Sequence, residues 1–259
     1  MNYIMPGGFK YSFQLQKTTS MQSDNFKFPM RLDRFISQST DYSRKQVKIL
    51  LKRGEVEVNG EIVKQPEQKI LNSDRVLLAG EPLNQLELRY FMLNKPVGFV
   101  CANKDLEHMT VLEFIDEPRR ENLSIAGRLD IDTTGLVLLT DDGQWLHQVI
   151  SPKHECEKIY LVETISPLDE KTIKKLEQGV WLKNDKTRTR PAQIEVIDEY
   201  HYRVTITEGR YHQVKRMFAA VENKVETLHR EKIGDIHLDP DLAPGEYRAL
   251  TLEEIKSIQ

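Results

Sequence analysis

The sequence predicts an α+β protein with a small N-terminal module and a larger domain built on a mixed, largely antiparallel sheet. From residue 30, apolar residues at helical spacing give way to an alternating pattern about an Asn-Gly pair. Beyond residue 88, helical segments separate strand-like runs without a repeated βαβ pattern. At 259 residues the chain has room for one sizeable domain and a small one.

The composition is that of a globular protein, with 30% charged and 39% hydrophobic residues and a net charge of −3. No apolar run approaches the roughly 20 residues of a membrane helix. A net charge this small means that RNA would have to bind through local basic patches. Cys101 and Cys156 are distant, which fits a reducing, cytoplasmic location. His154 beside Cys156 is too few ligands for zinc, so we expect no metal.

Residues 1–29 differ from the patterned segment that follows. They lack the apolar core of about 7–15 residues that a signal peptide needs. Two interpretations stay open: a flexible extension, or a true start at Met30.

Residues 30–84 predict two helices and a small sheet. Leu32, Phe35 and Ile36 mark a first short helix, and Asp41 or Ser43 can cap a second that Gly54 ends. The second helix carries the apolar residues Val47, Ile49, Leu50 and Leu51. Residues 55–63 alternate about Asn59-Gly60, which indicates a hairpin, and residues 74–78 add a strand.

The second helix also carries five basic residues and no acid, namely Arg44, Lys45, Lys48, Lys52 and Arg53. They form either a solvated helix face or a phosphate-binding surface. Like charges this close together repel one another, and bound phosphates neutralise that repulsion well. Residues 30–35 (MRLDRF), 43–47 (SRKQV) and 54–60 (GEVEVNG) resemble the S4 RNA-binding domain, which implies the second reading.

A polar linker, Pro82–Arg89, precedes the larger domain at residues 88–259. Its first strand starts at Tyr90 and is stopped by Pro96. We expect a tight turn at Asp142-Gly143 and a capping box at Thr251 and Glu254. Further strands are expected at 136–140, 158–162, 193–197 and 202–207, and helices at 144–150, from about 169, and within 208–221.

The polar loop before the buried strand 136–140 is the strongest functional signal. Residues 127–143 read GRLDIDTTGLVLLTDDG. The segment could be a solvated turn. Alternatively, Asp130 and Asp132 on an extended chain would face one side about 7 Å apart, near the spacing of paired catalytic carboxylates.

The complete string resembles the signature loop of RsuA-type pseudouridine synthases, which implies that Asp130 is catalytic. Residues 157–160 (EKIY) resemble the motif whose Tyr lies against the uracil, here Tyr160. Residues 212–216 (HQVKR) resemble the motif whose basic residue pairs with the catalytic Asp, which points to Lys215 with Arg216 as a rival. The family also implies that Arg128 fills the gap left by the flipped nucleobase.

This resemblance runs from Met30 to the end and is closer to members acting on small-subunit rRNA than to those acting on large-subunit rRNA. It implies isomerisation of one 16S rRNA uridine without a cofactor. The expected partner is 16S rRNA or a small-subunit assembly particle, with no membrane, and the chain is expected to be a monomer. Two alternatives stay open: a large-subunit rRNA enzyme, and a non-catalytic RNA-binding assembly factor.

Overall fold

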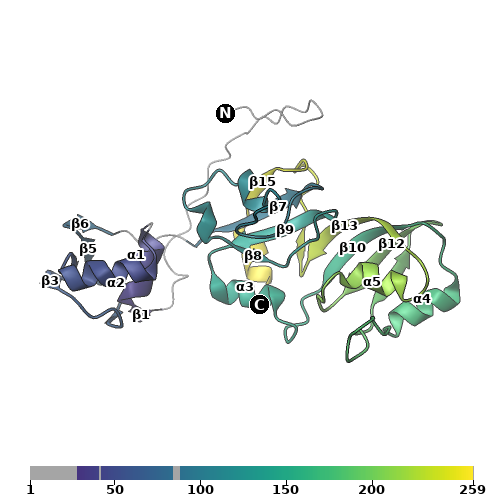
Figure 1. The fold of residues 1–259 in the computed structure, drawn as a ribbon, viewed down its shortest axis with the longest axis horizontal. Coiled ribbons are helices and arrows are strands. Elements are labelled where there is room, and N and C mark those ends of the chain that lie inside the picture. Colours follow the sequence, from purple (N-terminus) through teal and green to yellow (C-terminus); the bar gives the residue numbers. More distant parts are fainter. Residues whose placement is uncertain (1–27, 41, 84–87, 259) are drawn as a thin grey trace. The chain divides into compact units, whose positions relative to one another are not determined.

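The computed structural model describes residues 28–40, 42–83 and 88–258, which form two compact units (Figure 1). One unit ends at Leu88 and the other runs from Arg89 onward. The expectations for the N-terminal extension (apart from residues 28 and 29) and for a cap at Asp41 lie outside the described residues. Among the described residues, no helix has the length and apolar character that a bilayer crossing requires.

The first unit packs two helices against short strands. Ser43 caps the second helix through a capping box, and Gly54 ends it with a left-handed φ of 76°. Asn59 and Gly60, both at positive φ, form the predicted hairpin turn. The elements are β1 (Met30–Arg31), α1 (Leu32–Ser39), α2 (Arg44–Arg53), β2 (Val56–Val58), β3 (Glu61–Ile62), β4 (Lys69–Ile70), β5 (Val76–Leu78) and β6 (Glu81–Pro82).

The apolar side of α2 confirms the predicted spacing with one exception. Val47, Leu50 and Leu51 are buried, whereas Ile49 is exposed. Three residues at i, i+3 and i+4 share one helix face, and Ile49 lies off that face among the basic residues.

The second unit is built on a sheet that, over the described residues, has nine strands. Its main order is β11-β12-β10-β13-β9-β7-β15, with β14 beside β13 and β8 beside β9. The strands are β7 (Tyr90–Lys95), β8 (Ser124–Ala126), β9 (Thr134–Thr140), β10 (Lys158–Thr164), β11 (Gln193–Val196), β12 (His201–Ile206), β13 (Val225–Ile233), β14 (Ile236–His237) and β15 (Tyr247–Ala249).

Two antiparallel halves of this sheet meet at a short parallel junction between β9 and β13. The junction pairs His229 with Thr134 and Arg230 with Gly135. Gly135 has a φ of 102°, and a Cβ there would lie 2.3 Å from the Arg230 carbonyl oxygen. Glycine is therefore required where the halves join.

Helices lie on this sheet at points that bear on the site. They are η1 (Val111–Phe114), η2 (Arg120–Asn122), α3 (Gly143–Ile150), α4 (Glu170–Glu177), α5 (Gln213–Ala219) and α6 (Leu252–Ser257). Figure 1 shows α5 against the half of the sheet that contains β10 and β13. The capping box at Thr251 and Glu254 is confirmed at the start of α6.

The tight turn predicted at Asp142-Gly143 is wrong. Asp142 is instead the N-cap of α3, and its carboxylate accepts hydrogen bonds from the amides of Gln144 and Trp145. The Tyr90 hydroxyl donates to the second carboxylate oxygen. An Asp with two backbone partners and a tertiary partner starts a helix where the dipeptide alone favours a turn.

Candidate active site

The loop at residues 127–133 connects β8 to β9 and carries Asp130 at the junction of the two half-sheets. The loop is not extended as the carboxylate-pair reading assumed, because the Thr133 amide donates to the Asp130 carbonyl at 3.1 Å and closes a turn. The orientation of Asp130 and Asp132 is therefore set by a turn and not by strand alternation.

A buried lysine stabilises this turn through hydrogen bonds to backbone carbonyls. Lys95, at the end of β7, is 0% exposed and donates to the carbonyl oxygens of Pro96, Ile131 and Thr133 at 3.0, 3.3 and 2.7 Å. Burial lowers the pKa of its ammonium group. In the sequence, Lys95 stands directly before the Pro96 that stops the first strand of this domain, a position that by itself indicates no role.

Asp130 lies between two basic side chains at the start of α5. His212 Nε2 is 3.2 Å from Asp130 Oδ1, and Lys215 Nζ is 3.5 Å from Asp130 Oδ2. Lys215 also bonds Asp132 Oδ1 at 2.5 Å, and this hydrogen bond lowers the pKa of the Asp132 carboxyl group. His212 has a left-handed backbone, with φ at 48°.

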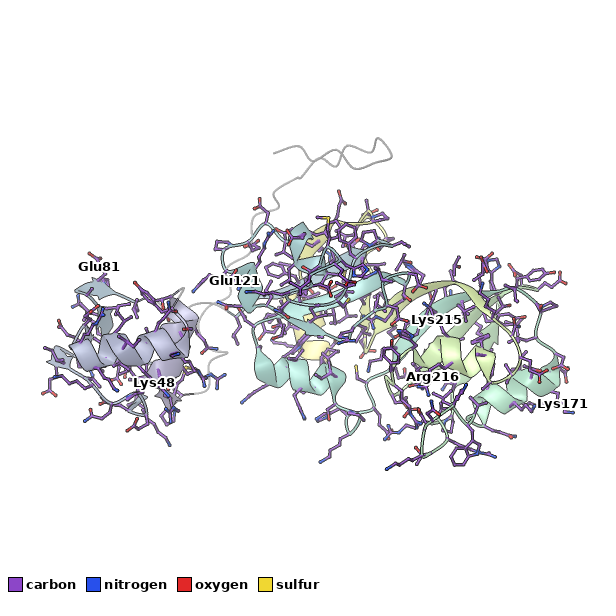
Figure 2. The ribbon with its side chains drawn as sticks, in the orientation of Figure 1. Lys48, Glu81, Glu121, Lys171, Lys215 and Arg216 are labelled. Atoms are coloured by element: carbon purple, nitrogen blue, oxygen red, sulfur yellow. The ribbon has the colours of Figure 1, made fainter. Side chains whose placement is uncertain are left out.

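Arg216 leaves α5 in a different direction from Lys215 (Figure 2). Its guanidinium bonds Asp185 Oδ1 at 2.5 Å and the carbonyls of Lys183 and Tyr211 at 2.7 and 3.1 Å. The geometry thus brings Lys215, and not Arg216, to Asp130. Neighbours one position apart on a helix point about 100° apart, so one of the two had to face elsewhere.

A cavity of about 460 Å³ opens beside Asp130. Tyr160, on β10, lines it and is largely buried, whereas Arg128 lies exposed at the edge. The ring of Tyr211, which is 70% exposed, stacks on His212 with centroids 3.7 Å apart. A partly polar cavity of this volume, lined by aromatic side chains, can take one nucleobase.

Two further basic side chains form the inner wall of the cavity. Arg230 is 1% exposed and donates to the carbonyls of Leu136 and Gly127, each at 2.8 Å. Lys158 donates to the carbonyls of Val149 and Cys156. Reasoning from sequence assigned neither residue, nor His212, a role.

The basic residues of α2 have a different environment. All five are exposed, and Lys48 projects from the helix in Figure 2. Among the described residues, their only ion pair joins Arg53 to Glu55 at 3.8 Å. We refer to Arg44, Lys45, Lys48, Lys52 and Arg53 as the α2 cations.

Comparison with known proteins identifies the family. Residues 89–220 match the RNA pseudouridylate synthase family, and residues 30–76 match the S4 domain. Over 230 residues, 88% of this chain, the sequence is 56% identical to ribosomal small subunit pseudouridine synthase A of Yersinia pestis, covering 98% of that protein. This chain belongs to the RNA pseudouridylate synthase family.

A second relative and a solved structure agree. The protein of the same description from Escherichia coli K12 is also 56% identical, over 88% of this chain and all of that one. A crystal structure described as a pseudouridylate synthase is 49% identical, covers 89% of this chain and all of its own, and has a TM-score of 0.65. The expected family and α+β fold, with an S4 domain before the pseudouridylate synthase domain, are confirmed.

The family membership makes the chain an isomerase of RNA uridine. Among the described residues, no cluster of three or more His, Cys, Asp or Glu could hold a metal ion.

Proposed function

We propose that this pseudouridylate synthase converts one uridine of small-subunit rRNA to pseudouridine, in the cytoplasm and as a monomer. The relatives named above are described as ribosomal small subunit enzymes, and this chain spans almost their whole length. The exposed α2 cations suit the phosphate backbone of that RNA. The substrate is 16S rRNA itself or a small-subunit assembly particle.

The observation that carries the mechanism is the position of Asp130 between His212 and Lys215 at the cavity. The target uridine leaves its stack, at a cost of a few kcal/mol. Its nucleobase lies against Tyr160 in the cavity. Asp130 acts on the target nucleotide as the nucleophile, while Lys215 and His212 hold its carboxylate in position.

Arg128 has a separate part in this proposal. It is exposed at the edge of the cavity and no described residue forms an ion pair with it, so it is able to reach into the RNA. We assign it to the gap that the flipped nucleobase leaves.

The alternatives differ in measurable ways. A large-subunit enzyme would modify a different rRNA with the same residues. A non-catalytic assembly factor would have no need of Asp130, Tyr160 and Lys215 together, and their joint presence at one cavity favours an enzyme.

Pseudouridine mapping of both rRNAs tests the proposal in cells that lack the protein and carry wild-type or Asp130→Asn copies. We expect one small-subunit pseudouridine to vanish and to return only with the wild-type copy. An unchanged small-subunit map would overturn the substrate, and a lost large-subunit site would establish the first alternative. Restoration by Asp130→Asn would favour the assembly factor.

A further inference from the structure

The two basic residues of the inner cavity wall lack the carboxylate partners that several partly buried arginines of this unit have. Arg203 pairs with Glu195 and Glu231, Arg248 with Asp239 and Glu254, and Arg210 with Asp185 and Glu208. Within the described part of the chain, no carboxylate lies within ion-pair distance of Arg230 or Lys158. Their polar partners are carbonyl oxygens and one phenol.

Such burial is unfavourable without compensation. Removing a cation from water costs several kcal/mol unless an opposite charge or a full set of hydrogen bonds replaces the water. Burial lowers the pKa of Lys158, and the positive charge of Arg230 contributes in the same direction. Two neighbouring cations without an anion therefore create a positive potential inside the cavity.

This potential is directed at the place where the nucleobase would lie. Arg230 and Tyr160 are paired across β13 and β10, and Arg230 Nη1 is 3.4 Å from the Tyr160 hydroxyl. The guanidinium carbon lies 5.9 Å from the centre of the Tyr160 ring. Both cations line the same cavity as Asp130.

The reaction produces a negative charge in that place. When the N1–C1′ bond breaks, its electron pair stays on N1, so the detached uracil is an anion with charge spread over O2 and O4. This holds whether Asp130 attacks C1′ or removes a sugar proton. After rotation, the C5 electron pair forms the bond to C1′ and the C5 proton is released, so no co-reactant is needed.

We propose that Arg230 and Lys158 stabilise the detached uracil anion. They are positioning residues that act through the field of the cavity wall, since Arg230 is covered by Tyr160 and the neighbouring backbone. The inference rests on the proposed function. Fixed charges of this kind stabilise a transition state because they need no reorganisation when the charge develops.

A better leaving group should depend less on these cations. Fluorine at C5 withdraws electrons and stabilises the uracil anion without help from the protein. The test uses full-length protein and small-subunit rRNA transcribed with uridine or 5-fluorouridine. Single-turnover loss of the target nucleoside is followed after digestion, alongside RNA affinity and thermal unfolding.

We expect Arg230→Gln to slow uridine cleavage about 100-fold but 5-fluorouridine cleavage only about 10-fold. RNA affinity should be unchanged. Lys158→Gln should show the same pattern more weakly, and it decides the question if Arg230→Gln does not fold. Arg230→Lys keeps the charge and should recover most of the rate on uridine.

Lys95→Met is the matched control, because Lys95 is also a buried cation on carbonyl oxygens but does not line the cavity. We expect it to slow both substrates by the same factor. Equal slowing of both substrates by Arg230→Gln and Lys158→Gln, or no slowing, overturns the inference. If these variants weaken RNA affinity and slow both substrates by the same factor, the cations bind an RNA phosphate instead. A wild-type protein that cleaves neither substrate would instead overturn the proposed function.

Discussion

The α2 cations and the basic residues around the cavity are alike in charge but differ in their exposure and in their bonding partners. The α2 cations are exposed on one short helix, and among the described residues only Arg53 has an ion-pair partner. Lys215, Arg230 and Lys158 come from separate elements and are held by carboxylates, carbonyls or a phenol. Exposed charges suit a phosphate backbone of any sequence, whereas charges fixed inside a cavity suit one reaction.

The largest expected effect is at Asp130. Asp130→Asn keeps the shape but removes the charge that acts on the substrate, so the single-turnover rate should fall by about 10⁴-fold or more while RNA affinity survives. Asp132→Asn is the matched control. Its side chain is more exposed and bonds Lys215, so we expect only partial loss. Equal abolition by both would instead favour a pair of acid and base carboxylates.

Lys215 should have the next largest effect. Lys215→Met removes the cation shared by Asp130 and Asp132, and we expect a fall of about 100-fold in single-turnover rate with little change in affinity. Lys215→Arg should keep part of the rate. Lys224→Met is the control, because Lys224 is exposed and pairs with Glu226. A loss of affinity in place of rate would place Lys215 among the binding residues.

The α2 cations should change binding and its salt dependence. We expect Lys48→Glu with Lys52→Glu to weaken rRNA binding and to lower the slope of log affinity against log salt by about 1.4–1.8, or about 0.7–0.9 per lost phosphate contact. Lys171→Glu with Lys175→Glu places the same change at the same spacing on α4 (Figure 2 labels Lys171). That pair should leave the slope unchanged; equal effects would make net charge the cause.

The smallest effect is expected from residues 1–29. The S4 match begins at residue 30, so a chain starting at Met30 should unfold at the wild-type temperature and retain wild-type turnover. Thermal unfolding and single-turnover assays of the shortened chain check this. Lost activity would make the extension a working part.

Local signals made the first unit predictable. Ser43, Gly54 and Asn59-Gly60 act within a few residues of themselves, so the cap, helix end and hairpin followed from sequence. The α2 cations were equally visible, because a charge run needs no tertiary information. Asp130 and Tyr160 came from motif resemblance, and the structure places both at one cavity.

The inner cavity wall depended on contacts that no local pattern contains. The sequence predicted no strand around Arg230, and only the parallel pairing of β9 with β13 brings the Leu136 and Gly127 carbonyls to this side chain. The choice between Lys215 and Arg216 likewise required knowing which face of α5 meets the loop. The prediction of a tight turn at Asp142 was wrong because Tyr90 and two helix amides donate hydrogen bonds to the Asp142 carboxylate.

We infer that the α2 cations serve RNA binding and that Lys215 serves the chemical step. Single-turnover rates at saturating protein, measured side by side for two variants on one rRNA fragment, test this division most directly. Lys48→Glu with Lys52→Glu should recover the wild-type rate once protein is in excess, because only affinity was lost. Lys215→Met should stay about 100-fold slow at any concentration. A saturating rate that remains low in the α2 variant, or that returns to normal in Lys215→Met, would contradict the division.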